Sequence, residues 1–78
     1  MRTPKYDPLR EWLKTSPGSV EIGLSDLAKL VGGLPPCAYR HREWWANETN
    51  GHVQARAWLE AGRRVSTVDL QNQMVVFS

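Results

Sequence analysis

Apolar residues in the first third of the chain follow a helical period and then a strand period. A stripe at i, i+3 and i+4 predicts a helix that begins at Asp7-Pro8 and ends before Pro17. From Val20 to Leu24, apolar residues then alternate with polar or small ones, as in a short half-buried strand. The helical stripe consists of Leu9, Trp12 and Leu13.

The next stretch predicts two helices joined by a tight turn. Ser25 caps the first of them, and Gly32-Gly33 end it, because glycine readily adopts the left-handed conformation found at helix ends. A proline pair opens a longer helix from Pro35 to Asn47, since proline suits a first helical turn. The adjacent Trp44 and Trp45 lie about 100° apart around its axis, so one anchors the core while the other reaches the core edge.

The last third of the chain predicts a further helix and a β-hairpin. The helix extends from about His52 to Ala61. Two β-branched, apolar runs, from Val65 to Leu70 and from Met74 to Phe77, flank three polar residues. This is the pattern of two strands joined by a short turn. The helix buries Ala55, Trp58 and Leu59, and the turn consists of Gln71, Asn72 and Gln73.

The predicted order is helix, strand, three helices, strand, strand, which indicates an α+β protein. With 78 residues the chain forms a single domain, spanning residues 1–78. Apart from its fourth helix, this order resembles that of a winged helix, where a lone early strand joins a C-terminal hairpin in a small antiparallel sheet. The resemblance implies that the helix from Pro35 to Asn47 is a DNA-recognition helix and that Gln71–Gln73 form the tip of the wing. The inserted helix departs from the usual winged-helix pattern.

Composition and charge narrow the location and the partners of the protein. A single cysteine, Cys37, excludes an intrachain disulfide, and no run approaches the roughly 18 apolar residues of a membrane span. The N-terminus has no signal-peptide pattern, so we expect a cytoplasmic protein. The net charge of +2 is weakly basic and does not by itself indicate nucleic-acid binding. Between Cys37 and Arg64, however, five arginines stand against three glutamates.

The arginines and polar residues of three segments form the candidate nucleic-acid surface. On the longer helix, Arg40 and Arg42 are suited to phosphate or guanine, because the guanidinium group is planar and bidentate. Asn47 at the end of that helix could contact adenine, although capping is the commoner role of asparagine there. The complete predicted set is Tyr39, Arg40, Arg42, Glu43, Asn47, Arg63, Arg64 and Asn72.

Two interpretations of function remain open at this stage. The first is a small module that binds nucleic acid, most simply double-stranded DNA. The second is a protein-interaction or regulatory module, because Val75, Val76 and Phe77 would place apolar groups on both faces of a small sheet. A homodimer through the C-terminal hairpin is compatible with either interpretation. Arginine-driven binding weakens steeply with salt, whereas apolar association does not.

The titratable residues predict neither an enzyme nor a metal site. Cys37 and His41 lie at i, i+4, but no third residue is evident that would orient a thiolate–imidazole pair. A cysteine beside prolines is more often a small buried hydrophobe. Cys37, His41 and His52 match no standard tetrahedral zinc spacing. We therefore expect a protein without catalytic residues or cofactors.

One sequence pattern resembles a widespread small bacterial domain of uncharacterised function. In that domain a Trp-Trp-x-Asn element, a histidine, an alanine-rich helix with a tryptophan, and an Ala-Gly turn recur in this order. The resemblance covers most of the chain, and it implies no activity and no catalytic residue. The matching residues are Trp44, Trp45, Asn47, His52, Trp58, Ala61 and Gly62, preceded by Leu34, Pro35 and Ala38.

Overall fold

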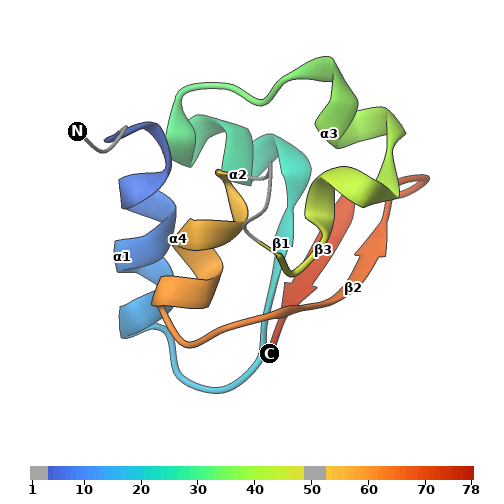
Figure 1. Ribbon diagram of the computed structural model, residues 1–78. Coiled ribbons are helices and arrows are strands. Elements are labelled where there is room, and N and C mark those ends of the chain that lie inside the picture. The colour runs from blue at the N-terminus through green and yellow to red at the C-terminus, as the bar shows by residue number, and fades with distance from the viewer. Residues whose placement is uncertain (1–3, 49–52) are drawn as a thin grey trace.

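The computed structural model describes residues 4–48 and 53–78 of the chain (Figure 1). These residues form an α+β fold with a small antiparallel sheet, as the sequence predicts. The elements are η1 (Pro4–Tyr6), α1 (Asp7–Thr15), β1 (Val20–Gly23), α2 (Leu24–Val31), α3 (Pro36–Arg40), η2 (Arg42–Trp45), α4 (Ala55–Glu60), β2 (Val65–Asp69) and β3 (Met74–Phe77), where η denotes a 3-10 helix.

The three strands pair in the order β1-β3-β2, so the early strand joins the C-terminal hairpin as predicted. Val75 in the central strand lies opposite Ile22 of β1 and Val68 of β2. A bulge interrupts β2 between Val65 and Thr67. The predicted hairpin is therefore confirmed, with β3 as the centre of the sheet and β1 and β2 as its edges.

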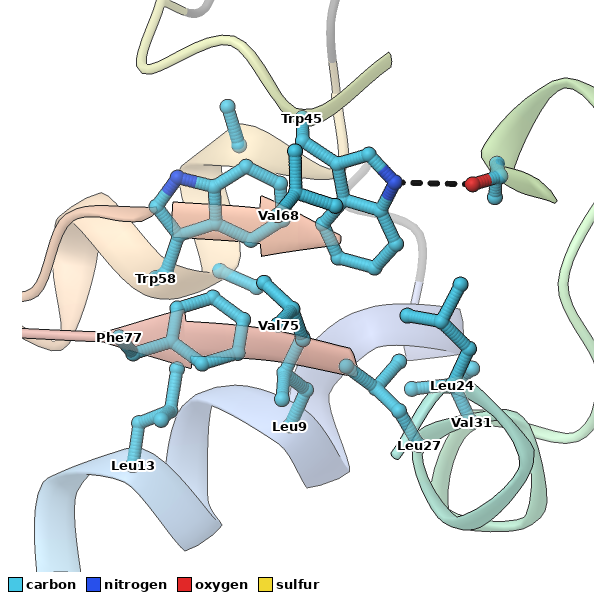
Figure 2. Packing of buried hydrophobic residues seen from close by; sticks show 13 residues of the cluster. Leu9, Leu13, Leu24, Leu27, Val31, Trp45, Trp58, Val68, Val75 and Phe77 are labelled. Atoms are coloured by element: carbon cyan, nitrogen blue, oxygen red, sulfur yellow. Dashed lines mark hydrogen bonds between the residues drawn. The ribbon is translucent and has the colours of Figure 1, made fainter. Parts of the chain in front are cut away.

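Aromatic and aliphatic side chains from the helices and from the sheet meet in one core (Figure 2). The Trp58 ring stacks on Trp45 at a centroid distance of 5.9 Å and meets Phe77 at 5.6 Å. Trp45 is buried while Trp44 is only half-buried, which confirms the division of roles expected for the tryptophan pair. The largest fully buried side chains are Trp58, Phe77, Leu9, Leu13, Leu24, Leu27 and Val75.

The start of α2 differs from the prediction. Leu24 is the first residue of the helix and not the last residue of the strand. The N-cap position is therefore occupied by Gly23 and not by Ser25. The Leu24 side chain is fully buried, and its backbone N–H donates to the Gln73 carbonyl at 2.8 Å. Core packing and this bond to the hairpin turn fix the boundary more strongly than a serine cap would. At the other end, Gly32 adopts the predicted left-handed conformation with φ 79°.

The prediction of one long helix from Pro35 to Asn47 is wrong. Helix α3 ends at Arg40, His41 is extended (φ −124°, ψ 118°), and η2 follows. The Trp45 indole N–H donates to the Ala38 carbonyl at 2.9 Å, a group that would bond the backbone N–H of residue 42 in a continuous helix. Burial of Trp45 against Trp58 therefore replaces the helical continuation.

The predicted fourth helix is present but shorter, because α4 covers Ala55–Glu60. Trp58 is fully buried on it, and Leu59 is half-buried. Gly62 follows with φ 76°, as expected of a glycine just past a helix end. His52, the predicted start, lies outside the described residues.

Candidate functional site

Arg40 ends α3, His41 links the two helices and Arg42 begins η2; these three exposed residues are called the Arg-His-Arg bend below. Within residues 4–48 and 53–78, the guanidinium groups of Arg40 and Arg42 make no hydrogen bond or ion pair. The backbone of the bend is nevertheless held, because the His41 N–H donates to the Cys37 carbonyl at 2.9 Å. The His41 carbonyl in turn accepts from the Trp44 N–H at 3.1 Å.

Buried residues fix this bend from beneath. Ala38 in α3 and Trp45 in η2 are both in the core. The buried Gln54 donates from Nε2 to the Trp44 carbonyl at 2.8 Å, which ties η2 to the segment before α4. The Trp44 ring packs edge-on against Tyr6 at 6.2 Å. The bend is therefore displayed from a fixed frame although it contains little regular helix.

Strand β2 contacts η2, and the turn between β2 and β3 follows that strand (Figure 1). The Asp69 carboxylate accepts from the Asn72 backbone N–H at 3.1 Å and from Asn72 Nδ2 at 2.8 Å. These bonds, the side-chain bond first, hold the pKa of Asp69 below its usual value, and the positive charge of Arg42 adds to the effect. The turn and the Arg-His-Arg bend thus share one region of the surface.

Asn47 has a structural role instead of an exposed position. Its Oδ1 accepts from Trp58 Nε1 at 3.0 Å and from the Val65 N–H at 2.8 Å. Its Nδ2 donates to the Val65 carbonyl at 2.9 Å. The amide therefore bonds both backbone groups of Val65 at the outer edge of β2 and accepts from the buried Trp58 indole N–H. It is not available to read adenine.

Arg63 also has a structural role. Its guanidinium group donates to the Leu13 carbonyl at 3.3 Å and to the carbonyls of Ser16 and Gly18. These carbonyls lie at and just beyond the C-terminal end of α1, so Arg63 complements that helix end rather than the end of α4. Arg64 is exposed, and its backbone pairs with Ser78.

The eight predicted site residues do not form a single surface. Arg63 and Arg64 precede β2, whereas the turn residue Asn72 follows it, so the length of the strand, about 16 Å, separates them. Tyr39 is half-buried and packs against the core. The residues that the structure brings to one region are Arg40, Arg42, Glu43 and Asn72.

Sequence reasoning missed Asp69, which shapes the turn beside Arg42. An aspartate at the end of a β-branched run, three residues before an asparagine, is a signal for such a side-chain-bonded turn. Gln54 was also missed, because its partner is a backbone carbonyl ten positions away that no local pattern reveals.

The other candidate chemistry does not assemble. Cys37 is exposed, not buried as predicted, and His41 belongs to the Arg-His-Arg bend. Among the described residues, no group of three His, Cys, Asp or Glu side chains is placed to hold a metal ion. His52, the third candidate ligand, lies outside these ranges. None of the described helices has the length and apolar character needed to cross a bilayer.

Comparison with known proteins identifies the chain at the level of its family. No curated protein and no solved structure matches it. Residues 6–78 match a family whose description is "Domain of unknown function (DUF7662)", a range that includes the core, the Arg-His-Arg bend and the whole sheet. Because this match covers nearly the entire sequence, the chain belongs to that family of small domains.

Proposed function

We propose that this domain binds nucleic acid, with double-stranded DNA as the partner, through the Arg-His-Arg bend and the adjacent β2–β3 turn. The observation that carries the proposal is the pair of exposed arginines whose guanidinium groups make no hydrogen bond or ion pair among the described residues, on a segment held by buried neighbours. Arginine binds phosphate bidentately, so a fixed pair of guanidinium groups is suited to a nucleic-acid backbone.

Other described arginines are engaged by the fold, which sets the bend apart. Arg10 donates to Glu60 at 3.0 Å, and its side chain is only 12% exposed. Arg56 pairs with Glu60 at 3.3 Å. Arg63 is bonded to the end of α1. Since those three arginines have structural partners, they are less available to an external anion than Arg40 and Arg42, whose guanidinium groups, like that of the exposed Arg64, make no hydrogen bond or ion pair among the described residues.

The resemblance to a winged helix supports the proposal through element order alone. The lone early strand pairs with the C-terminal hairpin, as in that fold. The part corresponding to a recognition helix is divided into α3 and η2. We therefore assign binding to the bend between them rather than to a helix inserted in a groove.

Fluorescence anisotropy on a random DNA duplex, measured across a range of salt concentrations, tests this proposal. We expect binding at about 50 mM salt, and we expect Arg40→Ala together with Arg42→Ala to reduce the slope of log affinity against log salt by about two. Arg64→Ala is the matched control, because Arg64 is exposed at the opposite end of β2. Equal binding by the double variant, or no binding by the wild type, would contradict the proposal.

A second candidate function is association through the outer face of the sheet. Val75 and Phe77 are fully buried in the core, so apolar groups of β3 reach the opposite face only at the half-buried Met74 and Val76. This observation favours a smaller contact than the sequence suggested. It also makes Val75→Lys unsuitable as a test, because that change would disrupt the core.

Sedimentation at micromolar concentration distinguishes this candidate. If the outer face forms a homodimer, Val76→Lys should dissociate it. Ser25→Lys, at an exposed position on α2, should leave it intact. A strictly monomeric wild type would rule out the homodimer.

A further inference from the structure

We infer that the Arg-His-Arg bend holds duplex DNA by its phosphates without reading base sequence, and that the acidic neighbours Glu43 and Asp69 weaken this contact. The inference rests on the proposed function and specifies its ligand and its mode of contact. It follows from the side chains that are exposed at the bend and from those that already bond within the protein.

The bend does not present an element that can enter a groove. Helix α3 has five residues, so it is about 7.5 Å long. The major groove is about 12 Å wide and 8.5 Å deep, and it is normally read by a longer helix or a β-ribbon. Ala38 in α3 and Trp45 in η2 are buried, which holds both short helices against the core. The arginines therefore meet a ligand at the surface, where phosphates lie.

The two asparagine side chains that the sequence assigned to this surface are engaged within the protein. Both ends of the Asn47 amide bond to Val65, and its oxygen also accepts from Trp58. The Asn72 amide donates to Asp69 at 2.8 Å. The bend itself carries no amide side chain, and the guanidinium groups of Arg40 and Arg42 suit phosphate.

The aromatic side chains favour a duplex over a single strand. Binding of single strands relies on open aromatic faces on which unpaired bases stack. Trp45 and Trp58 are buried, while Tyr39 and Trp44 are half-buried and packed against the core. Within residues 4–48 and 53–78, the exposed large hydrophobic side chain is Val53, which offers no ring. None of the described tryptophan, tyrosine or phenylalanine rings is fully exposed, which favours a duplex over a single strand.

Glu43 and Asp69 oppose the arginines at this site. Glu43 is exposed directly after Arg42, and the charge of Arg42 acts on the Asp69 carboxylate. Both acids would repel a phosphate held by Arg40 and Arg42. If Glu43 instead read a base by accepting a hydrogen bond from cytosine, its removal would weaken binding. The sign of the effect at Glu43 thus separates phosphate contact from base reading.

The test combines charge-neutralising variants with a sequence-selection experiment on the full chain. We expect Glu43→Gln and Asp69→Asn each to tighten binding to a random duplex by about two- to fivefold. Asp69→Asn keeps an oxygen that can accept from the Asn72 N–H, and a thermal melt checks that the turn survives. Glu21→Gln, which removes an exposed acid from β1, is the control and should change affinity less. Repeated selection from a random duplex pool should enrich no sequence.

Four outcomes would overturn the inference, and they separate base reading, a different ligand class and the absence of nucleic-acid binding. Weaker binding by Glu43→Gln, or a selected sequence bound more than tenfold tighter than the pool, would show base reading and leave the proposed function standing. Tighter binding to a single strand than to the matching duplex would show the wrong ligand class. No binding by the wild type at low salt would remove the proposed function and the inference together.

Discussion

At the scale of single residues, the Asn47 side chain supplies hydrogen bonds to the β2 backbone that a neighbouring strand would otherwise supply. Arg64 and Ser78 exchange backbone hydrogen bonds at 2.8 and 3.1 Å, so the neighbouring Val65 directs its N–H and carbonyl away from β3. The Asn47 amide satisfies both groups and also accepts from the Trp58 indole. An exposed strand edge invites pairing with other chains, and this contact closes part of it.

Replacing Asn47 with alanine should lower the free energy of unfolding by about 2–4 kcal/mol, because three hydrogen bonds are lost and a buried indole donor is left unpaired. Asn47→Asp keeps both accepted bonds, but it turns a carboxylate oxygen toward the Val65 carbonyl, so this variant should be destabilised as well. Urea denaturation measures both. A change below about 0.5 kcal/mol for the alanine variant would show that the amide is dispensable.

Asp69 gives a prediction for pH. Its pKa in the folded protein is lowered, so its stabilising contribution to the turn is present above the unfolded pKa and lost as pH falls through the folded one. The bonds to Asn72 should therefore persist through the pH range in which an ordinary aspartate is protonated and break only on further acidification. The Asn72 amide resonance should report this transition, and Asp69→Asn should abolish it. A midpoint at or above the ordinary carboxyl value would contradict the assigned hydrogen bonds.

At the scale of elements, local patterns predict what local interactions determine. Pro17 and Gly18 follow the end of α1, Gly32 ends α2, and the hairpin forms around its polar turn. The division of the central helix could not be predicted in this way. It depends on the stacking of Trp45 on Trp58 and on the hydrogen bond from Asn47 to Val65. Asn47 and Val65 are 18 positions apart in the sequence. No helical or strand period contains such contacts.

The Arg63 contact with α1 is another long-range feature, and it gives a matched pair of variants. Arg63→Met should lower the free energy of unfolding by about 1–3 kcal/mol, because the carbonyls of Leu13, Ser16 and Gly18 lose a charged donor. Arg64→Met removes the same charge from an exposed side chain and should have little effect. Thermal melts compare the two. Equal losses would show that Arg63 acts only through charge.

At the scale of the whole molecule, the fold divides the predicted site residues into two groups. Asn47 and Arg63 hold distant segments together, and Tyr39 packs on the core. Arg40 and Arg42 remain exposed at the surface beside the β2–β3 turn. Residue type alone could not separate these groups, because arginine and asparagine serve folding and binding equally well. The division requires the tertiary contacts.

Titration of the isotopically labelled domain with a DNA duplex, followed by backbone amide chemical shifts, tests the central claim most directly. We predict the largest shifts at Arg40, His41 and Arg42 and at the turn residues Gln71–Gln73, with little change at Val65 or Arg63. Shifts centred on Met74 and Val76 would instead place the contact on the outer face of the sheet. Their appearance there, or the absence of any shift at low salt, would contradict the assignment of nucleic-acid binding to the Arg-His-Arg bend.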